Sequence, residues 1–215
     1  MSQVAGRQEV ASRILAMRRD PWGLEIPADD EDARGYAELV VSVRRLLAAV
    51  AACAAAGEDS REMARALDDV SARAEAQGAG ERRQLHGRIP MAGAGSIILP
   101  PFGAIAHDDS SVTGTVVFDR HFSGANWAAH GGTIPLLFDD VMGRLVGPLA
   151  PSGARTAYLR TEYHAITPIG VDVAVHCEVE RVEGRKIFVR GELSHGETCT
   201  ASAEALFVVV RPGQP

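Results

Sequence analysis

The fold of this chain is decided by ten residues, His130-Gly131-Gly132-Thr133-Ile134-Pro135-Leu136-Leu137-Phe138-Asp139. The hydrophobic residues of this stretch and of the residues that follow recur with helical spacing, and together they surround most of the cylinder. Pro135 is compatible with a helix because it falls in the first turn, where amide hydrogens lack partners anyway. The stretch predicts a helix from Gly131 to about Val146. A helix that is apolar nearly all round is usually enclosed, as when a curved sheet wraps it.

Two features of this predicted helix indicate an acyl-transfer site. Free amides at a helix start favour an oxyanion. Asp139 follows about two turns later among apolar residues, where a buried carboxylate is costly unless it is paired or reactive. Apolar surroundings also make a carboxylate a more useful base, so we expect Asp139 to be buried. Asp140 points about 100° away from it, and we expect Asp140 to make a structural contact or to reach solvent.

Composition and charge exclude several classes of protein. Hydrophobic residues make up 46% and charged residues 23% of the chain, which is typical of a globular protein with a proper core. The net charge of −6 argues against non-specific nucleic-acid binding. The chain has no apolar run long enough for a transmembrane helix, and residues 1–20 do not resemble a secretion signal. We therefore expect a cytoplasmic protein that binds neither nucleic acid nor membrane.

The cysteines indicate neither a disulfide framework nor a metal site. Cys53, Cys177 and Cys199 are far apart, odd in number and without any zinc-ligand spacing. We expect ordinary thiols in a reducing compartment and no bound metal.

The chain changes character near residue 90. Before it, apolar residues with helical spacing predict one helix over residues 36–50 and a second helix that begins near Asp59. Their apolar stripes must pack on each other, on the following domain or on a partner subunit. We therefore divide the chain into a helical extension, residues 1–87, and a core domain, residues 88–215.

The core domain is expected to be an α+β structure. Residues 87–111 predict an irregular approach with an apolar centre at residues 97–99 and room for a short strand, and a strand follows residue 110. After the central helix, alternating residues and tight turns predict strands over residues 156–163, 171–180, 187–193 and 198–210. Consecutive strands with tight turns predict an antiparallel meander in front of which the helix lies.

This order of elements is similar to the hotdog fold, an antiparallel sheet wrapped around a central long helix, over roughly residues 90–212. His130-Gly131-Gly132, with Asp139 nine positions after the His, resembles the motif of acyl-CoA thioesterases of the phenylacetic-acid-pathway type. The segment 156–163, TAYLRTEY, followed by Pro168 and Gly170, looks like the T-x-x-L-x-x-x-Y strand and P-x-G turn of that family.

The resemblance implies catalytic roles by position. It assigns the amide of Gly131 to polarising the thioester carbonyl, and Asp139 to acting as nucleophile or as general base on water. A Ser or Thr contributed by the other subunit orients the attacking water in the family, and this position falls on Thr156 or Arg155. Asn126 stands where the family keeps a polar residue before the H-G-G.

Further residues are expected around the substrate. His130 either hydrogen-bonds the loop or takes part in the chemistry. The turn at residues 185–186 lies near the nucleotide end of coenzyme A in related folds, where basic side chains contact phosphates. The predicted substrate-binding residues are Gly132, Arg155, Arg160, Arg185 and Lys186.

These expectations combine into an acyl-CoA thioesterase that releases a carboxylic acid and free coenzyme A. Water is the second substrate, so no cofactor or metal is required. A single hotdog does not close the site, which implies a homodimer or homotetramer. The alternative from another class is a non-catalytic acyl-CoA binder or regulator. A hotdog dehydratase is disfavoured because its Glu position, fourteen residues after His121, is Pro135 here, and the hydratase Asp/His pattern is absent near the helix.

Overall fold

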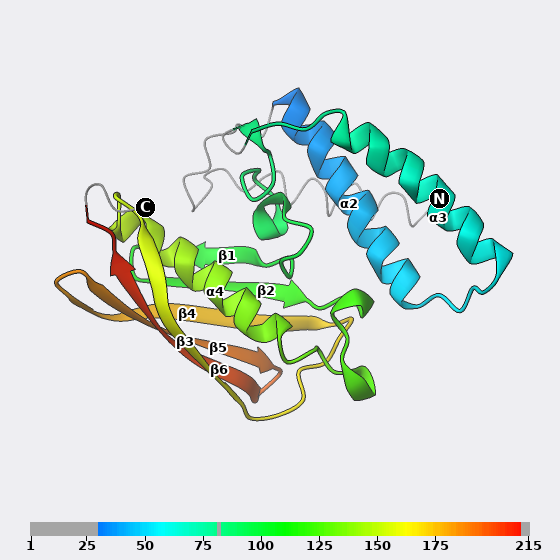
Figure 1. The fold of residues 1–215 in the computed structure, drawn as a ribbon. Helices are drawn as coiled ribbons and strands as arrows, with labels where there is room; N and C mark the ends of the chain where they lie inside the picture. The colour runs from blue at the N-terminus through cyan, green and yellow to red at the C-terminus, as the bar shows by residue number, and fades with distance from the viewer. Residues whose placement is uncertain (1–29, 81–82, 212–215) are drawn as a thin grey trace.

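A six-stranded antiparallel sheet curves around one helix, α4, in this computed structural model (Figure 1). The structure describes residues 30–80 and 83–211, so the prediction about residues 1–20 lies outside the described part. The helices are α2 (Glu31–Ala51), α3 (Glu58–Glu75) and α4 (Thr133–Val146). The strands are β1 (Gly103–His107), β2 (Ser111–Val117), β3 (Ala154–Tyr163), β4 (Asp172–Glu183), β5 (Lys186–His195) and β6 (Thr198–Val209).

The strand order is β1-β2-β4-β5-β6-β3. The predicted meander is confirmed for β4, β5 and β6, but β3 does not pair with β4, the strand that follows it. Instead β3 pairs antiparallel with β6 and forms one edge of the sheet, while β4 pairs with β2. The first strand covers residues 103–107 and not the apolar residues 97–99. Pro100 and Pro101 follow those residues directly and have no amide hydrogen to donate to a ladder.

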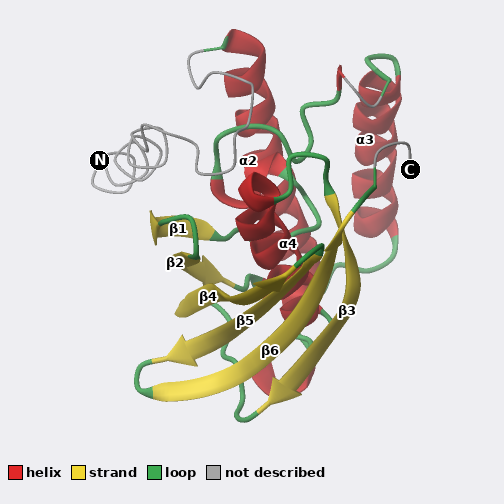
Figure 2. Ribbon diagram, turned by 90° about the vertical axis from the view of Figure 1, so that its left-hand side faces the viewer, coloured by secondary structure: helices red, strands yellow, loops and turns green. Residues whose placement is uncertain are grey.

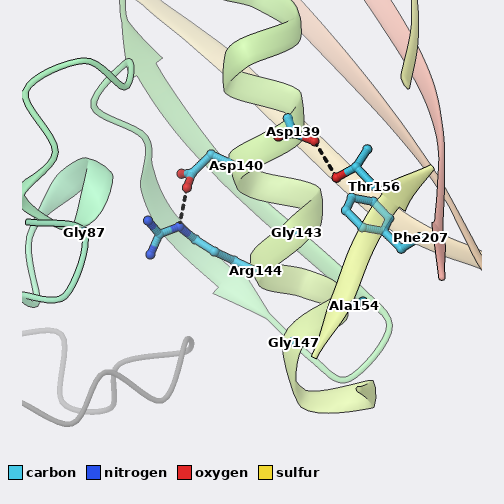
Figure 3. A pocket seen from close by; sticks show the side chains of 9 residues that line it. All are labelled: Gly87, Asp139, Asp140, Gly143, Arg144, Gly147, Ala154, Thr156 and Phe207. Atoms are coloured by element: carbon cyan, nitrogen blue, oxygen red, sulfur yellow. Dashed lines mark hydrogen bonds and ion pairs between the residues drawn. The ribbon is translucent and has the colours of Figure 1, made fainter. Parts of the chain in front are cut away.

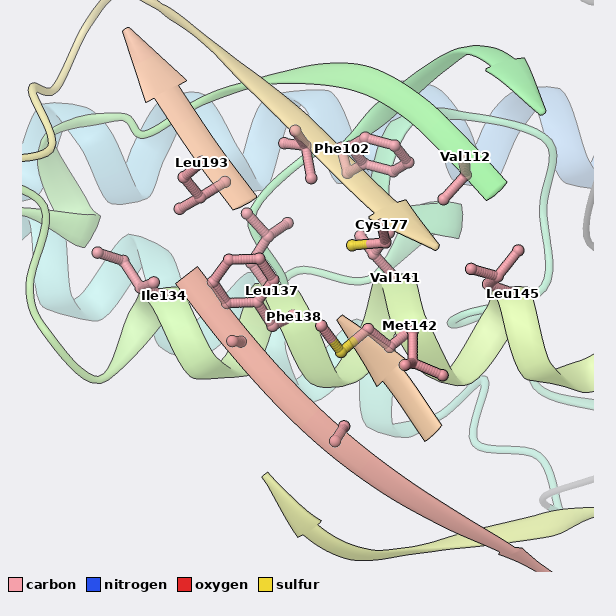
Figure 4. Packing of buried hydrophobic residues seen from close by; sticks show 14 of the residues in the cluster. Phe102, Val112, Ile134, Leu137, Phe138, Val141, Met142, Leu145, Cys177 and Leu193 are labelled. Carbon is pink, nitrogen blue, oxygen red and sulfur yellow. The ribbon is translucent and has the colours of Figure 1, made fainter. Parts of the chain in front are cut away.

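The core lies between α4 and the concave face of the sheet (Figure 4). Apolar side chains of α4 are buried there, as its nearly all-round apolar pattern predicts, and the facing side chains of β6 are small: Ala201, Ala203 and Ala205. On β5, a Cβ added to Gly191 would lie 2.8 Å from the Met142 Cε atom and 2.9 Å from the Phe138 ring. These small residues let the helix approach the sheet closely. Burial raises the pKa of the Cys177 thiol to about 12, so this cysteine is an inert part of the core.

Helices α2 and α3 differ in how they contact the rest of the protein. Helix α2 buries Ala33 and Val40, and its Arg44 donates Nη2 hydrogen bonds to the carbonyl oxygens of Ala92 (3.0 Å) and Ser96 (2.5 Å). It therefore packs on the segment that leads into the core domain. Helix α3 buries none of its residues and stands apart from α2 in the second view (Figure 2). The division at residue 88 stays a prediction. None of the described helices is both long and apolar enough to cross a membrane.

Candidate active site

The turn before α4 leaves one amide unused. Its neighbouring amides all have acceptors: Ala129 N donates to Thr167 O (2.8 Å), His130 N to Phe122 O (2.7 Å), Gly132 N to His130 Nδ1 (3.0 Å) and Thr133 N to His130 O (2.9 Å). None of the hydrogen bonds of the described residues uses the amide of Gly131. The residue predicted to polarise a carbonyl therefore has a free donor.

Within this turn, His130 and Gly132 hydrogen-bond to each other. Because His130 Nδ1 accepts a hydrogen bond, the neutral ring carries its proton on Nε2. His130 thus hydrogen-bonds within the loop, which is one of its two predicted roles. The Gly132 amide, predicted to bind substrate, is occupied by this ring.

Asp139 is exposed in the protomer, so the prediction that it is buried is wrong. Its Oδ1 atom accepts a 2.9 Å hydrogen bond from Thr156 Oγ1 of β3 (Figure 3). The side of α4 that carries Asp139 faces β3, an edge strand that has no further strand beyond it to enclose the carboxylate. Thr156 reaches Asp139 within one chain, and a hydroxyl supplied by another subunit stays a prediction.

Asp140 is the acid that the protomer encloses. Its side chain is 13% exposed and pairs at 2.8 Å with Arg144 Nε, whose side chain is 16% exposed. Burial raises the pKa of Asp140, and the Arg144 charge only partly offsets this effect. Asp140 therefore makes the structural contact that was expected of one of the two adjacent acids.

A cavity of about 360 Å³ lies between the second half of α4 and the start of β3. Three glycines and an alanine keep it open, and the Asp139–Thr156 and Asp140–Arg144 pairs lie along it (Figure 3). Its lining consists of Gly87, Asp139, Asp140, Gly143, Arg144, Gly147, Ala154, Thr156 and Phe207. A carboxylate with a hydroxyl partner at the mouth of a cavity can hold and activate a water molecule.

The sheet register shows which of Thr156 and Arg155 faces Asp139. Thr156 pairs with Phe207, whose side chain is buried on the inner face of β6, whereas Arg155 pairs with Val208. Successive residues of a strand point to opposite faces. Arg155 therefore lies on the outer face, away from Asp139, and Thr156 is the residue that meets the acid.

The other predicted residues are not brought to the cavity in one chain. Asn126 is exposed and takes a left-handed conformation with φ of 57° in the short turn η4 (Ala125–Trp127), without a hydrogen bond to the site. Arg160 pairs with Glu162 at 2.5 Å on β3. Arg185 Nη1 donates to Val209 O (2.8 Å), and exposed Lys186 follows it. Among the described residues no cluster of His, Cys, Asp or Glu could hold a metal ion.

Part of the core domain is similar to a known protein family. Residues 128–201 match the family model of the Thioesterase superfamily. The match covers 74 of the 215 residues, so this part of the chain is similar to the Thioesterase superfamily. The crystal structure of the thioesterase superfamily protein RHA08564 aligns with 80% of this chain and 94% of its own, with a TM-score of 0.69 and 24% identity. The curved sheet around α4 is therefore the hotdog fold. A share of 80% exceeds what residues 88–215 can supply, so part of the helical extension recurs in that structure as well.

Two curated relatives carry the name acyl-coenzyme A thioesterase THEM4. The one from Xenopus laevis is 34% identical over 39% of this chain and 38% of its own length. The one from Mus musculus is 30% identical over 44% of this chain and 41% of its own length. The match thus spans about two fifths of these relatives.

The core domain contains a further polar group that sequence reasoning missed. Thr161 lies two residues before the end of β3 and pairs with buried Ala203, and its Oγ1 atom is buried without a hydrogen-bond partner. A register irregularity between Thr156 and Tyr158 puts Thr161 on the inner face together with Thr156. Strict alternation over the five residues between them would put it on the opposite face, so the sequence alone carries no signal for it. An unpaired buried hydroxyl costs about 1–3 kcal/mol.

Replacing Thr161 with Val should therefore stabilise the protein, although most core substitutions destabilise. Valine keeps the volume and removes the unpaired hydroxyl, so we expect a melting temperature higher by about 2–4 °C, as about 1 kcal/mol gives at this size. Differential scanning calorimetry measures this shift, with Thr156→Val as the control because that hydroxyl is hydrogen-bonded. A lower melting temperature for Thr161→Val would show that the hydroxyl has a partner.

Proposed function

We propose that the core domain hydrolyses acyl-coenzyme A thioesters to a carboxylic acid and free coenzyme A. The observation that carries the proposal is the Asp139–Thr156 hydrogen bond at the cavity, together with the free Gly131 amide. The match of residues 128–201 to the Thioesterase superfamily and the names of the two curated relatives support the same reaction.

The chemistry assigns a task to each group. Thr156 holds Asp139 Oδ1, which leaves Oδ2 to accept a proton from water as this water attacks the thioester carbonyl. Exposure of Asp139 gives water direct access to the carboxylate. Negative charge then develops on the carbonyl oxygen, where an amide such as that of Gly131 stabilises it. The same carboxylate could instead attack as a nucleophile. Single turnover in ¹⁸O-water separates the two routes, because only direct attack by water labels the product at once.

The active unit proposed here is a homodimer, because Gly131 and Asp139 of one chain cannot act on one thioester. Eight residues of α4 and its turn separate them by about 12 Å. The carbonyl of His130 points into the helix towards Thr133, so the Gly131 N–H in the same trans peptide points the opposite way, away from α4. A two-fold axis would bring the Gly131 of one copy to the Asp139 of the other and would form two equal sites.

Two features of the protomer support this arrangement. The edge strand β3 leaves one row of backbone groups unpaired, and edge strands commonly pair with a second chain. Leu136 lies beside Asp139 on the same side of α4 and is 36% exposed. Light scattering on the purified protein tests the dimer, and a monomer at assay concentration would contradict it. Arg185 and Lys186 remain candidates for contacts to the coenzyme A phosphates in such a dimer.

The activity itself is tested with a panel of acyl-CoAs of increasing chain length and a thiol reagent that detects free coenzyme A. We expect turnover of at least one member without added metal. Thermal stabilisation by acyl-CoA without any release of thiol would instead indicate the non-catalytic binder.

A further inference from the structure

Tyr163 makes a hydrogen bond that the proposed reaction does not use. It is the last residue of β3, and its Oη atom donates to the carbonyl oxygen of Gly131 at 2.6 Å. Its ring also covers the glycine. The three atoms nearest to a Cβ added at Gly131 are Oη, Cζ and Cε1 of Tyr163, at 3.7, 3.8 and 3.9 Å.

The two peptide planes that flank the Cα atom of Gly131 are both anchored. In the first plane the His130 carbonyl oxygen accepts from Thr133 N (2.9 Å) and Thr133 Oγ1 (2.7 Å). In the second plane the Gly132 amide donates to His130 Nδ1, and the Gly131 carbonyl oxygen accepts from Tyr163. These bonds leave the Gly131 N–H as the one polar group of the two planes without a partner among the described residues.

The hydrogen bond from Tyr163 differs from the other three because its donor lies outside the turn. The remaining three bonds join residues 130–133 to one another, so they hold the turn together but do not fix it to the rest of the protein. Tyr163 ties the turn to a strand 32 residues away. The same strand carries Thr156, which holds Asp139, so β3 contacts both groups that the proposed reaction needs.

We propose that Tyr163 is a positioning residue that fixes the direction of the Gly131 amide. This inference rests on the proposed function, because the amide matters only if it meets a developing oxyanion. Without the bond from Tyr163, the Gly131–Gly132 plane keeps only the hydrogen bond from Gly132 N to His130 Nδ1, and the turn loses its link to β3. Because glycine has the largest conformational freedom of all residues, the turn can then shift as a unit and change the direction of the Gly131 N–H. An oxyanion donor acts through its fixed placement, and a small misplacement lowers the rate of the chemical step more than it lowers substrate binding.

The test compares Tyr163→Phe with Tyr158→Phe. Both tyrosines lie on β3 with similar exposure, 55% and 47%, but Tyr158 pairs with Leu206 on the outer face, and its hydroxyl makes no hydrogen bond among the described residues. We expect Tyr163→Phe to lower kcat about tenfold, the worth of one hydrogen bond, with KM changed less than about twofold. Tyr158→Phe should keep both values within about twofold. Unchanged kcat in Tyr163→Phe, or a change in KM alone, would overturn the proposal.

A second readout separates this proposal from the proposed function. In ¹⁵N-labelled protein, Tyr163→Phe should shift the amide resonances of Gly131 and Gly132 and should raise the exchange rate of the Gly132 amide about fivefold, as the loss of about 1 kcal/mol predicts. Tyr158→Phe should leave both resonances in place. If the wild type turned over no acyl-CoA, the proposed function would fail while these spectra still decided whether Tyr163 holds the turn. Identical spectra of Tyr163→Phe and the wild type would refute its positioning role.

Discussion

Replacing Asp139 with Asn is expected to lower kcat by at least about 100-fold, the usual contribution of a general base. The substitution keeps an oxygen that accepts the hydrogen bond from Thr156, but it removes the charge that takes the proton. Asp139 is exposed, so the free energy of unfolding should change by less than about 0.5 kcal/mol. Kinetics of coenzyme A release and a thermal melt of the same preparation measure both effects.

Asp140→Asn provides the comparison for this experiment. It breaks the half-buried pair with Arg144, so its main effect should be a lower melting temperature. A variant Asp139→Asn with the kcat of the wild type would show that Asp139 is neither base nor nucleophile. The proposed reaction would then have no group to activate water.

Replacing Gly131 with Pro should lower kcat by about 10²–10³, because proline removes the N–H that stabilises the oxyanion. The matched control is Gly131→Ala, which keeps this N–H. Its Cβ would lie 3.7 Å from the nearest atom of Tyr163, an ordinary contact, and the glycine does not take a left-handed conformation. Gly131→Ala should therefore keep most of the activity. Equal losses in the two variants would assign the effect to the shape of the turn and not to its amide.

The same two inactive variants test the shared site. In a mixed dimer of Asp139→Asn and Gly131→Pro chains, one of the two sites receives an intact Gly131 from one chain and an intact Asp139 from the other. Random mixing then restores about a quarter of the wild-type activity. Sites formed within single chains would stay inactive after mixing, and this outcome would contradict the two-fold arrangement. Refolding the variants together and separately gives the comparison.

The elements of the fold could be predicted because each depends on a local pattern. The all-round apolar sequence of α4 specifies a helix, and the alternation of apolar and polar residues in β4 and β5 specifies strands. Both patterns can be read from neighbouring residues alone. The position of β3 could not be predicted in this way. It depends on which distant strand accepts its backbone hydrogen bonds, and β6 lies more than thirty residues later in the chain.

The candidate site shows the same limit. The order of His130, Gly131 and Asp139 in the sequence predicts the turn and the candidate acid, because the motif that it resembles is local. The exposure of Asp139 could not be predicted, since enclosure of its side of α4 depends on β3, an edge strand whose position is not set by local sequence. The bond from Tyr163 to Gly131 was missed for a related reason: a tyrosine at a strand end has no sequence pattern that reveals its partner.

Gly87 forms part of the cavity wall, and the segment that follows it is held by Arg44 of α2 through two carbonyl oxygens. The cavity beside Asp139 is thus bounded on one side by the segment after Gly87. Helix α2 supports this segment and contributes no residue to the proposed reaction. Natural variation in α2 can move this wall and alter which molecules fit, while the turn and the acid remain unchanged. The segment that bounds the cavity near Gly87 is therefore separate in the chain from the segments that carry Gly131 and Asp139.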